Sequence, residues 1–146
     1  MQKLEFDAAV EMIVSRDPRY ARDAYHFLNE ALRHTVKQRR KGRDPGGETH
    51  VNGRQLLEGI RVFALKEFGP MVVTVFEYWG LRRCQDFGEM VYNLVRVKLL
   101  AKTDSDSIED FRDVYTFQEA FLDPFLPPKP VLHVRGPVKR PAEELN

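Results

Sequence analysis

The sequence predicts an all-α fold: a compact single-domain helical bundle of about five to seven helices with an extended Pro-rich C-terminal tail. Apolar residues recur at helical spacing through most of the 146-residue chain, and Gly, Pro and capping residues separate these helical segments. The chain is 42% apolar, with ten Phe and five Tyr, which suffices for a core. Residues 1–126 are the predicted domain and residues 127–146 the tail, because five of the nine prolines fall in the last twenty residues.

Two helices are expected before the first loop. The first has apolar residues at helical spacing: Phe6, Ala9, Val10 and Ile13. Asp17 is expected to cap the second, with Pro18 at its first position, where a missing N–H costs nothing. This helix should continue to about Lys41. Its expected buried stripe comprises Tyr20, Ala24, Phe27, Leu28, Ala31 and Leu32.

A third helix is expected after a loop dense in Gly, Pro and charge. Asn52 and Gln55 have capping-box spacing at its start, and Gly69 followed by Pro70 should end it. Residues 70–80 are nearly all apolar and are interpreted as a buried helix, although their three valines would also suit a strand.

The stretch CQDFGEMVYNLV, residues 84–95, contains the letters D-F-G, which hold magnesium in protein kinases. The chain has no G-x-G-x-x-G loop and no H-R-D motif, so the kinase interpretation is rejected. Asp86 is followed three residues later by Glu89, and we expect Asp86 to cap a helix. Two short helical pieces should follow, the second with Thr116 and Glu119 as cap partners.

Residues 75–95 also have the helix, Gly-containing turn and helix of a DNA-binding motif. The second helix would read the DNA, yet Asp86 and Glu89 in its first turn would repel phosphates. A packing motif is therefore favoured over a DNA reader.

Two charged stretches are the candidate interaction surfaces. The candidate basic patch comprises Arg33, Lys37, Arg39, Arg40, Lys41 and Arg43. The candidate acidic patch comprises Asp104, Asp106, Glu109, Asp110 and Asp113. The basic patch could contact nucleic acid, but basic residues also suit a helix C-terminus and no aromatic residue is interleaved with them. The two patches could instead pair with each other, within the fold or between copies.

The histidines are weaker candidates for a functional site than the two charged patches. His26, Glu30 and His34 stand at steps of four on the second helix, a geometry that could hold a metal. Their neighbours are charged, so the stripe is interpreted as solvated, and we expect no metal and no cofactor. His50, near the start of the third helix, is a candidate hydrogen-bond partner at that boundary.

The single cysteine, Cys84, excludes an intrachain disulfide. Arg82 and Arg83 could lower the pKa of its thiol, but no His or Asp is placed by the sequence to complete a nucleophilic site. We expect a plain thiol at the surface or half-buried. The N-terminus carries acids unlike a signal peptide, and no apolar run approaches the roughly 20 residues that span a bilayer. A cytoplasmic protein without membrane contact is expected.

The motifs HVNGRQLLEGI, EFGPM, YWG and DFGEMVYNLV, in this order, resemble those of a family of small bacterial proteins known mainly from planctomycetes and verrucomicrobia. The resemblance extends from about Phe6 to Phe121 and excludes the tail. That family has no established activity, cofactor or catalytic residue. The resemblance therefore implies a bacterial cytoplasmic protein and assigns no site residue.

These observations favour a non-enzymatic binding or regulatory module that acts through protein–protein contacts. The net charge of +1 gives no global field toward nucleic acid or a membrane, and no complete catalytic set is present. The alternative is a nucleic-acid-binding protein that uses residues 33–43 and the tail. A small enzyme is the third and least favoured class.

Overall fold

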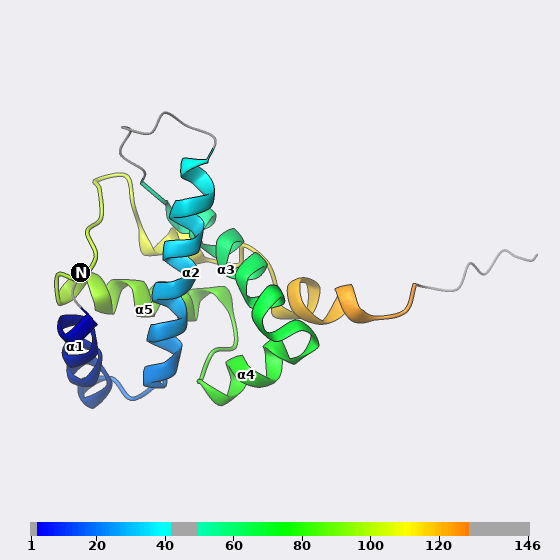
Figure 1. Cartoon of the computed structure of the whole chain (residues 1–146), viewed down its shortest axis with the longest axis horizontal. Coiled ribbons are helices and arrows are strands. Elements are labelled where there is room, and N and C mark those ends of the chain that lie inside the picture. Colours follow the sequence, from blue (N-terminus) through cyan, green and yellow to red (C-terminus); the bar gives the residue numbers. More distant parts are fainter. Residues whose placement is uncertain (1–2, 42–49, 129–146) are drawn as a thin grey trace, which may run out of the picture.

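Five α-helices and no strand make up the part of the chain described by the computed structural model, residues 3–41 and 50–128 (Figure 1). The helices are α1 (Lys3–Arg16), α2 (Arg22–Arg40), α3 (Gly53–Phe68), α4 (Val72–Tyr78) and α5 (Cys84–Arg96). Four short helical turns complete them: η1 (Gly69–Met71), η2 (Ile108–Phe111), η3 (Gln118–Leu122) and η4 (Asp123–Phe125). The all-α prediction is confirmed, and the valine-rich segment is a helix. The predicted tail from residue 129 onward, and Arg43 of the basic patch, lie outside the described residues.

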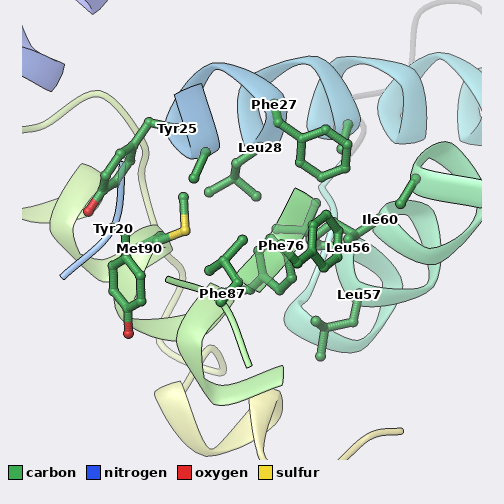
Figure 2. Close-up of a cluster of buried hydrophobic side chains, with 14 of the residues drawn as sticks. Tyr20, Tyr25, Phe27, Leu28, Leu56, Leu57, Ile60, Phe76, Phe87 and Met90 are labelled. Carbon is green, nitrogen blue, oxygen red and sulfur yellow. The ribbon is translucent and has the colours of Figure 1, made fainter. Parts of the chain in front are cut away.

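The helices enclose one hydrophobic core, to which each contributes its apolar face. α2 packs along α3, and its other flank contacts α1. Figure 2 shows side chains of α2, α3, α4 and α5 meeting in this core. The labelled core residues are Tyr20, Tyr25, Phe27, Leu28, Leu56, Leu57, Ile60, Phe76, Phe87 and Met90. Tyr25, which the expected stripe of the second helix omitted, is fully buried.

Phe76 of α4 stands at the centre of an aromatic cluster. Its ring is fully buried and meets Phe27, Phe87 and Phe121 edge-on at centroid distances of 5.4–5.5 Å. Edge-to-face packing of this kind adds to the energy of burial. Residues 75–95, which also suggested a DNA-binding motif, thus hold two aromatic anchors of the core, Phe76 and Phe87.

α2 and α3 approach closely because Gly59 has no side chain. A Cβ atom at this position would lie 1.8 Å from Thr35 Oγ1. The Thr35 hydroxyl is itself buried and donates a hydrogen bond to the Ala31 carbonyl at 2.7 Å. The spacing of the two helices therefore depends on this glycine.

The start and end predicted for the third helix are confirmed. The Asn52 side chain accepts a hydrogen bond from Gln55 N at 2.8 Å, and Gln55 Oε1 accepts one from Asn52 N at 3.0 Å. Gly69 ends α3 with a φ of 52°, a left-handed conformation that glycine adopts without steric cost. The Thr116 and Glu119 pair also forms, since Glu119 N donates to Thr116 Oγ1 at 3.1 Å.

The predicted start of the second helix is wrong. α2 begins at Arg22, and Asp17 belongs to a turn in which its carboxylate accepts from Arg19 N and the Arg19 guanidinium. Residues 18–20 form a turn, and Ala21 has an extended backbone conformation in which its N–H donates to the Trp79 carbonyl at 3.1 Å. A contact with the distant end of α4 thus overrides the local Asp-Pro signal.

The predicted role of Asp86 as N-cap is also wrong, by three residues. α5 begins at Cys84, and Asp86 lies in its first turn with its carboxylate turned back toward the preceding backbone. Asp86 Oδ2 accepts hydrogen bonds from Arg82 N at 2.8 Å and Arg83 N at 3.2 Å. Glu89 takes no part in this cap and lies 3.5 Å from the Arg19 guanidinium. The stretch starts a helix as expected, with a different residue at its boundary.

Candidate interaction surface around α2

The basic patch does not form one surface, because its members point to different sides of α2. Arg33, Lys37 and Arg40 are separated by four and three residues and share one face of the helix. We call this set the basic face. Arg39 instead lines a separate hollow between α2 and α3, together with Arg54. Lys41 is exposed just after α2 ends.

The basic face lines a groove of about 810 Å³ between α2, α1 and the loop after α5. Its apolar walls come from Phe6 of α1, Leu32 and Val36 of α2, and Leu100 of the loop. Arg33, Lys37 and Arg40 are exposed, and in the described residues no carboxylate forms an ion pair with any of them. The groove therefore combines cationic side chains with accessible apolar surface.

The opposite end of the groove carries negative charge. Asp7 of α1 and Glu30 of α2 line it, and Asp7 Oδ1 lies 3.7 Å from His26 Nε2. Glu30 precedes Arg40 by ten residues, about 15 Å along the helix. The charge along the groove thus changes sign from the α1 end toward the end of α2.

The two histidines of the stripe formed by His26, Glu30 and His34 pack against different helices. The His26 ring meets Phe6 edge-on at 5.2 Å, whereas the His34 ring packs on Phe63 at 5.3 Å. Within residues 3–41 and 50–128, no three His, Cys, Asp or Glu side chains are arranged to hold a metal ion.

The acidic patch borders a second hollow, a cleft of about 210 Å³ between α3, α5 and the segment after α5. Asp106 and Asp110 line this cleft, and His50 Nε2 lies 3.1 Å from Asp106 Oδ2. His50 is thus a boundary partner, as expected, and its partner is a carboxylate 56 residues away. Hydrogen bonds from Thr103 N, and then from His50, hold the pKa of Asp106 below its usual value although burial opposes them.

Several acids of the patch have local structural roles. Asp110 accepts a hydrogen bond from Ser107 N at 3.1 Å at the start of η2, and Asp113 accepts one from the Gln85 amide at 2.9 Å. Glu109 pairs with Arg112 at 3.2 Å, and both side chains are about two-thirds exposed. Asp104 is exposed. In the acidic patch, Asp104, Glu109 and Asp113 are therefore exposed, whereas Asp106 and Asp110 are half-buried and hold the conformation of the segment.

The basic groove and the acidic cleft share a wall. Leu32 and Val36 of α2 and Leu100 line both hollows. These three side chains are half-buried, so they form an apolar strip that still reaches the surface. The loop after α5 runs beside the C-terminal half of α2 to make this arrangement (Figure 1).

A polar cluster joining α5 to the turn before α2 was not predicted from the sequence. The buried Asn93 amide donates to Asp17 Oδ2 at 3.1 Å and to the Tyr25 hydroxyl at 3.0 Å. The Arg19 guanidinium, with help from Asn93, holds the pKa of Asp17 well below its usual range. This cluster therefore connects α5 to the turn before α2, two elements 76 residues apart in the sequence.

Tyr20 and Asp86 form a second such link. The Tyr20 hydroxyl donates to Asp86 Oδ1 at 2.7 Å. Burial, and then this hydrogen bond, raise the pKa of Tyr20. Asp86 therefore supports both the start of α5 and the buried hydroxyl of Tyr20.

Cys84 is more buried than the sequence suggested. It is fully buried, and its thiol donates to the Tyr115 carbonyl at 3.1 Å. Burial raises the pKa of Cys84, which is opposite to the lowering considered for Arg82 and Arg83. The two arginines are exposed, and the thiol points into the core instead of toward them.

No family profile, curated protein or solved structure matches this chain significantly. In the described part of the chain, no helix is long and apolar enough to cross a membrane.

Proposed function

We propose that this protein is a non-enzymatic binding module whose basic face on α2 receives an acidic segment of a protein. The observation that carries the proposal is the groove in which Arg33, Lys37 and Arg40 stand beside accessible apolar walls without an ion-pair partner among the described residues. That the protein acts in a bacterial cytoplasm is part of this proposal and rests on the sequence resemblance.

The charge pattern favours a protein ligand over nucleic acid. A phosphate backbone is best bound by a continuous row of cations, because affinity grows with each phosphate that is neutralised. Here Asp7 and Glu30 line the same groove as the three cations, and Arg39 is turned to another face. A peptide can instead place carboxylates against the basic face and apolar side chains against the walls.

The expected energy of the three charges is modest. Exposed ion pairs contribute about 0.2–1 kcal/mol each, so removal of three charges should weaken binding by about 3- to 150-fold. The effect should be largest at low ionic strength, since exposed charges are screened by salt.

Fluorescence anisotropy with a labelled peptide tests the proposal. The peptide has about twelve residues of alternating glutamate and leucine, long enough to fill a groove of this kind. The test variant is Arg33→Gln/Lys37→Gln/Arg40→Gln. The matched control is Lys66→Gln/Arg82→Gln/Arg83→Gln, which removes three exposed cations away from the groove. Labelled duplex and single-stranded DNA are titrated in parallel.

The proposal expects the wild type and the control variant to bind the peptide equally, and the test variant to bind it weakly. Equal weakening in both variants would show that net charge alone governs binding, and would contradict the role of the basic face. Tighter binding of DNA than of peptide, lost in the test variant, would favour the nucleic-acid alternative.

A further inference from the structure

The surface that contains the basic face also contains acidic residues, which lie on the other side of a shared apolar strip. On one side of the apolar strip of Leu32, Val36 and Leu100 stand Arg33, Lys37 and Arg40. On the other side stand the carboxylates of the cleft, Asp106 and Asp110, within a segment that also exposes Asp104 and Glu109.

Such a surface is complementary to itself under a two-fold rotation. If a two-fold axis passes through the apolar strip, the basic half of one copy faces the acidic half of the other, and the reverse contact forms at the same time. Two-fold interfaces pair the same patch on both copies, so they need this kind of self-complementarity. The strip would form the apolar centre of the contact and the charges its rim, as protein interfaces are commonly built.

We infer that the occupant of this surface is a second copy of the chain, and that the protein forms a two-fold symmetric dimer through it. This inference rests on the proposed function, since it names the acidic segment that the basic face receives. The segment is residues 104–113 of the partner copy.

The charges do not satisfy each other within one copy. Although both halves border the same strip, no ion pair joins the basic face to the acidic patch in residues 3–41 and 50–128. The net charge of +1 also leaves little repulsion between copies. Within the described residues, the basic face and the acidic patch are thus available to pair across a contact between two copies.

Charge reversal tests the inference by sedimentation equilibrium at low ionic strength. One variant is Arg33→Glu/Lys37→Glu and the other is Asp104→Lys/Glu109→Lys. All four side chains are exposed, and the one described ion pair among them is the exposed Glu109–Arg112 contact, so the fold should be retained. Circular dichroism and thermal unfolding verify this for each variant.

The wild type is expected to dimerise, with a dissociation constant that rises at least about tenfold between low and high salt. Each variant alone should be monomeric, because like charges then face each other at both contacts. An equimolar mixture should form a heterodimer, since both contacts are complementary again. If either variant is less folded, the neutralising variants Arg33→Gln/Lys37→Gln and Asp104→Asn/Glu109→Asn replace them. Each of these is expected to raise the dissociation constant of the dimer.

A wild type that remains monomeric at all accessible concentrations, or a mixture that stays monomeric while the wild type dimerises, would overturn the inference. Open-ended oligomers larger than a dimer would also overturn the inference. Such oligomers form when two different patches of neighbouring copies meet head to tail, without a two-fold axis. The peptide titration separates the two proposals. Peptide binding by a monomeric wild type would leave the proposed function standing and remove the dimer alone.

Discussion

Replacement of Asp86 by alanine should destabilise the protein by more than an ordinary lost helix cap. The Asp86 carboxylate accepts hydrogen bonds from Arg82 N, Arg83 N and the Tyr20 hydroxyl, at 2.8, 3.2 and 2.7 Å. The loss of a cap alone costs about 1 kcal/mol. The Tyr20 side chain is 3% exposed, and a buried hydroxyl left without an acceptor costs about 1–3 kcal/mol more. The expected total is about 2–4 kcal/mol.

A double-mutant cycle with Tyr20→Phe isolates the contribution of the Tyr20–Asp86 hydrogen bond to the free energy of unfolding. Tyr20→Phe alone should cost about 1 kcal/mol, since one hydrogen bond is lost. In the Tyr20→Phe background, Asp86→Ala no longer orphans a hydroxyl and should cost about 1 kcal/mol, the value of the cap. The two substitutions should therefore be non-additive by about 1 kcal/mol or more.

Urea unfolding followed by circular dichroism measures all four proteins of the cycle. Glu89→Ala serves as the control, because Glu89 lies in the same helix and does not cap it; its removal should change stability by less than about 0.5 kcal/mol. Additive effects of Asp86→Ala and Tyr20→Phe would refute the buried hydrogen bond. An equal cost for Glu89→Ala would favour the capping box expected from the sequence.

Two further stability predictions concern the helix contact and the turn before α2. Gly59→Ala should destabilise by about 1–2 kcal/mol even though alanine favours a helix, because its Cβ would lie 1.8 Å from Thr35 Oγ1. Addition of Thr35→Ala should recover part of this loss in urea unfolding, whereas full additivity would contradict the contact. Asp17 has a pKa well below its usual range, chiefly through Arg19, so it stabilises the fold above its unfolded pKa of about 3.9 and this contribution is lost as the pH falls below that value. Urea unfolding from about pH 5 to pH 2 should therefore show a shallower decline of stability for Asp17→Asn than for the wild type, and parallel curves would exclude this role.

Local sequence signals predicted those helix boundaries that depend on neighbouring residues. Asn52 and Gln55 lie three residues apart and satisfy each other's backbone groups without help from elsewhere. Gly69 ends α3 through its own backbone conformation. Helical spacing likewise identified Phe27 and Leu28 as core residues, because the period of an α-helix is sufficient to define its buried face.

The boundaries that were wrong depend on distant contacts. Asp17 followed by Pro18 is a good local start signal, yet residues 18–20 form a turn and Ala21 N donates to the Trp79 carbonyl before α2 begins. Asp86 and Glu89 have the spacing of a capping box. Asp86 instead lies in the first turn of α5, where its carboxylate accepts a hydrogen bond from the Tyr20 hydroxyl. Local patterns contain no information about such pairings.

The candidate surface was only partly visible in the sequence. The charge run identified the basic residues, and helical geometry could have separated Arg33, Lys37 and Arg40 from Arg39. The apolar wall supplied by Leu100 could not be anticipated, because it comes from a loop about sixty residues further along the chain. The same holds for the shared border between the groove and the acidic cleft.

An NMR titration of the isotope-labelled protein with the glutamate–leucine peptide tests the role of the basic face most directly. We expect the largest amide shifts on Arg33 to Arg40 and on Leu100, and we expect them to disappear in the Arg33→Gln/Lys37→Gln/Arg40→Gln variant. Shifts centred instead on the exposed apolar side chains Met71 and Tyr78, unchanged in that variant, would contradict it.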